Sequence, residues 1–294
     1  MSAERRAAAF LAALLLACAR PPVAGNVAAV TIAPLADLVA RLAGERWQVR
    51  TIVPPGISPH VFDPKPRDVR AFADARLVVS VGAGYDDWVS RCVAAAASKA
   101  FLHDAGATVG VVAEEGGHDQ HAHGELGHDP HWWLSPVLAA RALPPLAARL
   151  SELDPPGREG YAARALELTA VLERLDAELG RTLSSVRGRP FVTAHNAWSY
   201  LAERYGLVVA GSIEPVPGRE PSPKDLLRLV ASARSRNLTA VFTEPQFPTG
   251  AARVIAGDAG LKLEELDPFG GVPGRLHYED MMRFNARSLL EGLS

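Results

Sequence analysis

Three histidines stand alone in the sequence, each directly after a break between predicted elements. His60 follows a proline-rich segment, His131 lies in the run DPHWW, and His195 follows a short apolar segment. Asp267 occupies a similar position after another apolar segment. Ligands of open α/β sheets bind at the carboxyl ends of the strands, so two facing sheets would bring all four side chains into one cleft. Three imidazoles and one carboxylate suit the tetrahedral coordination of Zn²⁺. From position alone, the alternative is a surface or hydrogen-bonding role for each histidine.

The available donor atoms limit both the metal and the chemistry. Cys92 is the one thiol expected in the exported chain, and its helical, apolar surroundings predict a buried packing residue. Without thiolates, Cu(I) and iron–sulfur centres are disfavoured. Four protein ligands leave no open position for a substrate, which predicts that the protein is not an enzyme. The sequence has no HExxH motif and no nucleophile elbow. The alternative is a zinc hydrolase in which Asp267 acts as a general base.

A second group of histidines lies in a low-complexity loop at residues 114–128. Its members stand among Gly, Asp and Glu and are His118, His121, His123 and His128. Exposed imidazoles are ready metal ligands at neutral pH, so the loop is a candidate for auxiliary metal capture. The alternative is a solvated loop without a required role.

Three further residues have simpler predicted roles. We expect His103 at the surface, and we expect His277 to be a surface group or a cap of the last helix. Glu244 follows a predicted strand and is expected to be a hydrogen-bonding partner rather than a ligand.

The amino terminus has the pattern of an export signal. Arg5 and Arg6 precede an apolar stretch of 11 residues that ends before Cys18. A membrane-spanning helix needs about 20 residues, so this stretch is too short to span. The run LLAC that ends at Cys18 resembles a bacterial lipobox, which predicts lipidation of that cysteine. The alternative is cleavage by signal peptidase near residue 24.

The elements expected to position the site alternate between strand and helix. Apolar, β-branched segments separated by helical patterns predict parallel sheets covered by helices. The expected strands are residues 27–32, 47–53, 75–81, 190–193, 207–210, 240–243 and 262–266. We therefore expect an α/β fold of two Rossmann-like lobes, joined by a long helix, with the metal site in the cleft between them.

The longest helical pattern, residues 158–185, divides the two lobes. Leucines recur along it at spacings of three and four, between proline-containing breaks. The expected organisation is a signal peptide and tether at 1–25, an amino-terminal lobe at 26–150, a linking helix at 151–187 and a carboxyl-terminal lobe at 188–294.

The overall composition fits an ordinary folded protein. The chain has 294 residues, 48% of them apolar and 22% charged, with a formal net charge of −2. This balance gives no electrostatic basis for binding nucleic acid. We expect a monomer.

Several runs, in order along nearly all of the mature chain, carry a family resemblance. They are PPGISPH at 54–60, PKP at 64–66, DPHWWLSP at 129–136, VTAH at 192–195, YLAERYGL at 200–207, EPSPKDL at 220–226, FTEPQF at 242–247, LDPFG at 266–270 and DMMRFN at 280–285. Together they resemble the zinc- and manganese-specific solute-binding proteins of ABC importers, the cluster A-I metal-binding lipoproteins, of the zinc type.

The resemblance implies a site, a cargo and partners. By position in the motifs, His60, His131, His195 and Asp267 are the implied ligands. Manganese-selective relatives carry Glu at the third position, so His195 favours Zn²⁺, with Mn²⁺ as the alternative cargo. The implied partners are a permease and its ATPase, at the periplasmic face or cell surface. A zinc buffer or an adhesin of the same fold is a further alternative.

The chain departs from the family pattern at two positions. Ser135 and Asn196 stand where the family often has Asp, which leaves the groups that orient the ligands open.

Overall fold

Two four-stranded parallel sheets form the framework of the protein. The structure, a computed structural model, describes residues 25–111 and 129–294. The predicted signal, the lipidation site Cys18 and the histidine-rich loop with His118, His121, His123 and His128 therefore lie outside the described residues.

The first sheet has the strand order β2-β1-β3-β4. Its strands are β1 (Val27–Val30), β2 (Gln48–Thr51), β3 (Leu77–Ser80) and β4 (Phe101–Asp104), and all pairings are parallel. The central strands β1 and β3 are buried along their whole length. A parallel strand covered on both faces has no solvent side, which explains their continuous apolar sequence.

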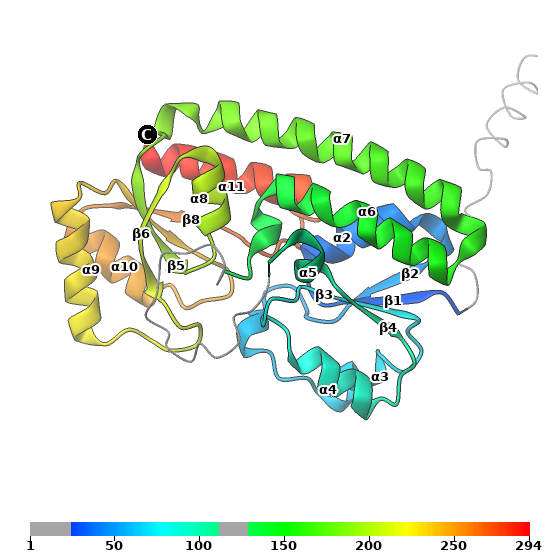
Figure 1. Cartoon of the computed structure of the whole chain (residues 1–294). Coiled ribbons are helices and arrows are strands. Elements are labelled where there is room, and N and C mark those ends of the chain that lie inside the picture. Colours follow the sequence, from blue (N-terminus) through cyan, green and yellow to red (C-terminus); the bar gives the residue numbers. More distant parts are fainter. Residues whose placement is uncertain (1–24, 112–128) are drawn as a thin grey trace, which may run out of the picture.

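Helices cover both faces of this sheet (Figure 1). One side carries α2 (Ala33–Ala43), α5 (Ala105–Val109) and α6 (Pro136–Leu153), and the other carries α3 (Pro66–Arg70) and α4 (Trp88–Ala95).

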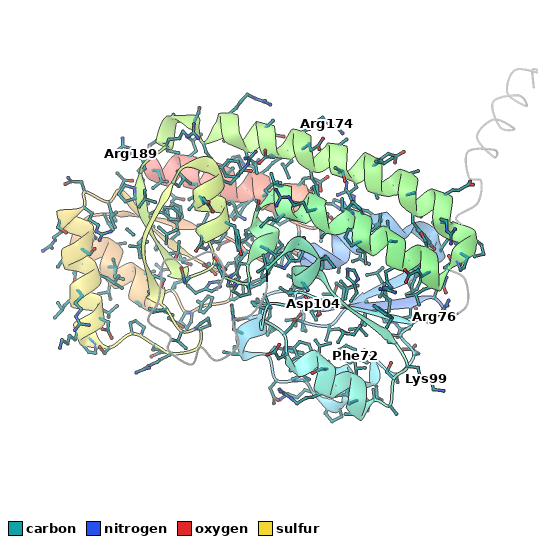
Figure 2. The ribbon with its side chains drawn as sticks, viewed as in Figure 1. Phe72, Arg76, Lys99, Asp104, Arg174 and Arg189 are labelled. Atoms are coloured by element: carbon teal, nitrogen blue, oxygen red, sulfur yellow. The ribbon has the colours of Figure 1, made fainter. Side chains whose placement is uncertain are left out.

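A separate apolar core lies beneath α3 and α4. Phe72 is fully buried in it (Figure 2), beside Val78 of β3. Cys92 belongs to the same core, which confirms the predicted packing role.

One prediction in this lobe is wrong. His103 was expected at the surface, but it lies on the edge strand β4 and is only 6% exposed. Phe101 and Leu102, which precede it on the strand, are both exposed, so β4 lacks the usual alternation of buried apolar and exposed polar residues. Burial lowers the pKa of His103, because the charged imidazolium loses its hydration.

The second sheet repeats the same topology, with the strand order β6-β5-β7-β8. Its strands are β5 (Pro190–His195), β6 (Val208–Glu214), β7 (Ala240–Thr243) and β8 (Lys262–Glu265), again in parallel. The prediction ended β6 at residue 210, but a register shift lets the strand continue to Glu214.

Four helices surround the second sheet: α8 (Ser199–Tyr205), α9 (Pro223–Ser235), α10 (Gly250–Ala259) and α11 (Tyr278–Leu293). The start of α9 is a capping box, in which the Ser222 hydroxyl accepts from the Asp225 amide and the Asp225 carboxylate accepts in return.

The long helix α7 (Arg158–Thr182) runs along both lobes (Figure 1). It packs on α6, α2 and α11, and its inward leucines belong to one apolar core that extends through both lobes. Arg174 lies on its outer side (Figure 2).

The structure confirms the predicted α/β fold of two lobes. The exact segment boundaries, including 151–187 for the linker, remain our proposal, since α6 runs on to residue 153. No helix within residues 25–111 and 129–294 is both long and apolar enough to cross a membrane.

Candidate metal centre

Local chain breaks position the three histidines. His60 lies in a 3₁₀ turn (Pro59–Val61) that follows β2, in a segment opened by prolines. His131 immediately precedes a second 3₁₀ turn (Trp132–Leu134), and His195 is the last residue of β5. His131 is 2% exposed and His195 is 1% exposed. The two lobes therefore bring their imidazoles to one place, with His60 and His131 from the first lobe and His195 from the second.

The three imidazoles converge through their Nε2 atoms. Nε2 of His131 lies 3.0 Å from Nε2 of His60 and 3.3 Å from Nε2 of His195. One nitrogen from each ring belongs to a group whose members all lie within 4.8 Å of one another. Three ring nitrogens at this separation can surround one ion, because Zn–N bonds are about 2.0–2.1 Å long.

Carboxylates stand behind two of these imidazoles. Oδ1 of Asp129 lies 2.7 Å from Nδ1 of His131 and also accepts the His131 amide at 2.9 Å. Oε2 of Glu244 lies 2.6 Å from Nδ1 of His195, although the two atoms are not aligned as a hydrogen bond. The other oxygen of Glu244 accepts from Trp198 Nε1 at 3.0 Å. A carboxylate beside Nδ1 favours the proton there, which leaves the Nε2 lone pair free for a metal.

Burial keeps the cluster ready for a cation. It lowers the pKa of His60 well below 6.5, and the neighbouring His131 and His195 lower it further. It also lowers the pKa of His131, against the opposing effect of Asp129. Both rings are therefore neutral at neutral pH, and a metal need not displace protons from them.

Aromatic side chains form the walls around the cluster. The ring of Tyr85 packs against His60 with centroids 4.5 Å apart, and Trp133 packs against His131 at 5.1 Å. Phe247 packs against His195 at 5.0 Å. These rings limit the rotation of the imidazoles and exclude water, which strengthens electrostatic interactions inside the site.

Asp267 is buried nearby but stands outside the group of converging nitrogens. Its Oδ1 accepts from the amides of Phe269 and Gly270, both at 3.0 Å. Its Oδ2 lies 3.2 Å from Arg275. The three predicted histidines thus lie together. The predicted aspartate lies outside their group, where its carboxylate contacts two backbone amides and an arginine.

The other residues singled out from the sequence have distinct positions. His277 is exposed, and its Nδ1 contacts Asp37 at 2.9 Å, as expected for a surface group. Glu244 is the predicted partner rather than a member of the histidine group.

The sequence reasoning missed Asp129, Tyr85 and Arg275. Asp129 could have been predicted from the sequence, because a carboxylate two residues before a ligating histidine can reach both the amide and the ring of that histidine. Tyr85 and Arg275 carry no local signal of their contacts with the site.

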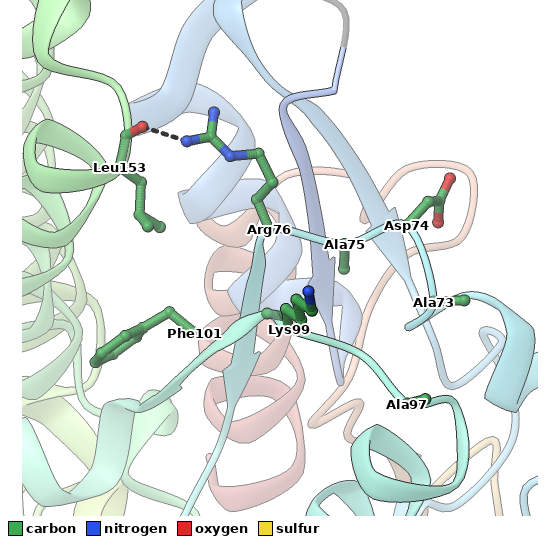
Figure 3. Close-up of a pocket in the computed structure, with 9 residues that line it drawn as sticks. Ala73, Asp74, Ala75, Arg76, Ala97, Lys99, Phe101 and Leu153 are labelled. Atoms are coloured by element: carbon green, nitrogen blue, oxygen red, sulfur yellow. Dashed lines mark hydrogen bonds between the residues drawn. The ribbon is translucent and has the colours of Figure 1, made fainter.

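A separate cavity lies away from this cluster. It measures about 710 Å³ and is open at the amino ends of β3 and β4, with Arg76, Lys99 and Phe101 on its walls (Figure 3). Arg76 is held there by a 2.6 Å hydrogen bond to the carbonyl of Leu153. None of the three clustered histidines lines it.

Two α/β lobes around a tri-histidine cluster define the class, a two-lobed metal-binding protein. Residues 29–292 match the family described as zinc-uptake complex component A, periplasmic, and the chain belongs to that family.

Individual relatives agree with this assignment. The chain is 29% identical over 277 residues to the high-affinity zinc uptake system protein ZnuA of Bacillus subtilis (strain 168), covering 90% of this chain and 86% of the relative. A crystal structure of ZnuA superposes with a TM-score of 0.80 and 31% identity, covering 92% of this chain and 99% of that one. A ZnuA deletion mutant with zinc bound gives a TM-score of 0.79 and 32% identity, covering 92% and 98%.

A further neighbour carries a different metal. The solute-binding protein FpvC of Pseudomonas aeruginosa, in complex with Mn²⁺, gives a TM-score of 0.76 at 25% identity, covering 91% of this chain and 98% of that one.

Proposed function

We propose that this protein captures Zn²⁺ outside the cytoplasm and delivers it to an ABC importer. The observation that carries the proposal is the convergence of three Nε2 atoms, with carboxylates at Nδ1 of His131 and His195. Family membership over residues 29–292 supports the uptake role and the periplasmic location.

We propose Asp267 as the fourth ligand. Its Oδ1 is engaged by two backbone amides, so Oδ2 is the oxygen that would bind the ion. That oxygen now contacts Arg275 at 3.2 Å, and binding exchanges this contact for the metal. A set of three nitrogens and one oxygen is a common environment for Zn²⁺.

Zinc is the proposed cargo because nitrogen predominates among the donors. Imidazole suits Zn²⁺, whereas Mn²⁺ favours carboxylate and water oxygens. Manganese is the second candidate, supported by the Mn²⁺ complex of a structural neighbour.

The partners and the anchor complete the proposal. A permease and its ATPase would receive the ion from a monomeric binding protein that is lipid-anchored through Cys18, at the end of the lipobox-like run. The loop histidines His118, His121, His123 and His128 would collect zinc weakly, and the main site would survive their removal.

We propose a binding function without catalysis. With Asp267 bound, four protein ligands leave no position for a reacting water. A zinc hydrolase would need Asp267 free as a base. Metal-dependent cleavage of an ester or peptide panel would favour that alternative.

Calorimetric titration of the metal-free protein with Zn²⁺ and Mn²⁺ tests the function. Wild type should bind one Zn²⁺ tightly and Mn²⁺ far more weakly. His195→Ala should lose the tight site, whereas His277→Ala, which removes an exposed imidazole, should retain it. Tighter binding of Mn²⁺ would overturn the zinc assignment, and weak binding unaffected by His195→Ala would overturn the site.

A further inference from the structure

A small cavity of about 150 Å³ lies between the two lobes, beside the histidine cluster. Ser58 and Val61 of the first lobe form one wall, and Glu214 and Glu220 of the second lobe contribute to the other. The clustered histidines are not among its lining residues, so this cavity is distinct from the site described above.

The cavity nevertheless adjoins the cluster. Phe247 lines it and packs its ring on His195, with centroids 5.0 Å apart. Gln246 also lines it and donates to Asp267 Oδ1 at 3.3 Å. Each of these side chains thus contacts both the cavity and a proposed ligand.

Two carboxylates line this cavity, those of buried Glu214 and exposed Glu220. Glu214 is 5% exposed, and its Oε2 accepts from the amide of Gly218 at 3.2 Å. Within the described part of the chain, no Lys or Arg forms an ion pair with Glu214 or Glu220. A buried carboxylate without a cationic partner is costly, and a bound cation removes that cost.

Two neutral oxygens at the same cavity also lack partners. The Ser58 hydroxyl is buried, in a residue that is 5% exposed, and makes no hydrogen bond. The side-chain oxygen of Gln246 is likewise buried and unpartnered. Buried polar atoms nearly always have a hydrogen-bonding partner. Two unpartnered oxygens beside two carboxylates therefore indicate a ligand that binds to oxygen atoms, such as a cation.

The donor set and the size define the ligand. Carboxylate, hydroxyl and amide oxygens suit hard divalent cations. A water molecule occupies about 30 Å³ in the liquid, so the cavity has room for an ion that keeps some of its waters.

We propose that this cavity is a second cation site, which binds a hydrated divalent ion through oxygens of Glu214, Glu220, Ser58 and Gln246. It lies at the mouth of the histidine cluster and differs from it in donor chemistry. Cation binding at this second site does not rest on the proposed function. Only its position beside a bound zinc cargo rests on that function.

Paramagnetic NMR with Mn²⁺ tests the second site. The full mature chain, with the four loop histidines changed to Ala, is first loaded with one equivalent of Zn²⁺ and then titrated with Mn²⁺. We expect selective broadening of the amide signals of Ser58, Gly218 and Gln246. The double variant Glu214→Gln/Glu220→Gln should weaken this Mn²⁺ binding at least about tenfold, because ligand charge governs the affinity of oxygen-donor sites.

A matched variant controls for net charge. Glu203→Gln/Glu291→Gln removes the same charge at two exposed positions outside the cavity. Its amide signals should broaden with Mn²⁺ as they do in the parent, the protein in which only the loop histidines are changed. If the Glu214 and Glu220 variant does not fold, Ser58→Ala provides the comparison and should also weaken Mn²⁺ binding.

Two results would overturn the second site: no selective broadening in the parent, or equal broadening in both double variants. Failure of the proposed function can be distinguished from failure of the second site, because the parent would then not bind one equivalent of Zn²⁺ at the clustered histidines. Mn²⁺ broadening at Ser58 and Gly218 can still be measured in that protein.

Discussion

At the scale of single residues, the buried carboxylates do more than orient the imidazoles. A divalent ion held by neutral rings brings two positive charges into a buried site. Asp129 and Glu244, each less than 3 Å from an imidazole Nδ1, offset that charge. The cluster therefore has electrostatic compensation as well as geometry for a divalent cation.

The first residue-scale prediction concerns Asp129. In Asp129→Asn, the amide can donate to Nδ1 and so move the His131 proton to Nε2, which blocks the metal-binding lone pair. Zinc affinity, measured by competition with a chelator, should fall by about 10–100-fold. Asp63→Asn removes an equal charge from a side chain that is 83% exposed and should leave the affinity unchanged. Equal affinities in the two variants would show that Asp129 does not support the site.

The second prediction concerns the role of Asp267. Asp267→Asn keeps an oxygen for the amides of Phe269 and Gly270 but replaces the proposed ligand oxygen with NH₂. Zinc affinity should fall while the unfolding midpoint without metal stays close to wild type. Unchanged zinc affinity would mean that the three histidines bind the ion without this carboxylate.

At this scale, the convergence of the histidines was easier to predict from the sequence than the contacts of the residues around them. His60, His131 and His195 follow strands or proline breaks, and topology brings such positions together. The contact between Asp267 and Arg275 depends on how the segment after β8 folds back, which no local pattern encodes.

At the scale of elements, α7 ties the lobes together through one face. Leu172 on this face is fully buried, whereas Leu166 on the same helix is 75% exposed. Both belong to the leucine pattern that predicted the helix, so periodicity identified the element but not which leucines lie inside.

The prediction for α7 compares these two leucines. Leu172→Ala should reduce the free energy of unfolding by about 2–5 kcal/mol, because it leaves a cavity in the core shared by the lobes. Leu166→Ala removes the same atoms from an exposed position and should change it by less than about 0.5 kcal/mol. Denaturant unfolding of the metal-free protein measures both. Similar losses in the two variants would contradict the packing described for α7.

A charged contact between α2 and the start of α11 predicts a pH effect. The hydrogen bond to Asp37 raises the pKa of His277 above its usual 6.5. The stabilisation is therefore present below pH 6.5 and is lost as the pH rises through the folded-state pKa. An NMR titration should show the His277 pKa falling towards 6.5 in Asp37→Asn. An unchanged pKa in this variant would exclude the contact in solution.

The strand predictions failed where the sequence pattern does not match the burial or pairing of the residues in the structure. β4 is an edge strand with two exposed apolar residues and a buried His103, so its alternation gives no strand signal. β6 passes through Gly211 and Ser212, which suggest a turn, and only pairing with β5 extends it to Glu214. The central strands β1 and β3, buried on both faces, were predictable from their apolar runs.

At the scale of the whole molecule, several contacts hold the lobes in place without the metal. Trp133 of the first lobe donates its indole N–H to the Pro268 carbonyl at 2.8 Å, and its own carbonyl accepts from Tyr278 at 2.6 Å. Arg41 pairs with Glu279 across the same boundary at 2.6 Å. These contacts and α7 oppose a wide hinge motion.

Zinc binding should therefore produce only a small change in the relative position of the lobes. Small-angle X-ray scattering of metal-free and zinc-loaded protein should give nearly superimposable profiles. Crystal structures of both forms would provide the finer comparison. A large rotation of one lobe on the other would contradict the restraint that we assign to α7.

The central claim is that three imidazoles of the cluster bind the ion, and zinc K-edge X-ray absorption tests it most directly. The protein is loaded with one equivalent of Zn²⁺, in parallel with the variant whose loop histidines are changed to Ala. We predict the same spectrum from both, with four N or O neighbours at about 2.0–2.1 Å and the outer-shell scattering of three imidazoles. A spectrum with one imidazole or none, or one that changes when the loop histidines are removed, would contradict the tri-histidine site.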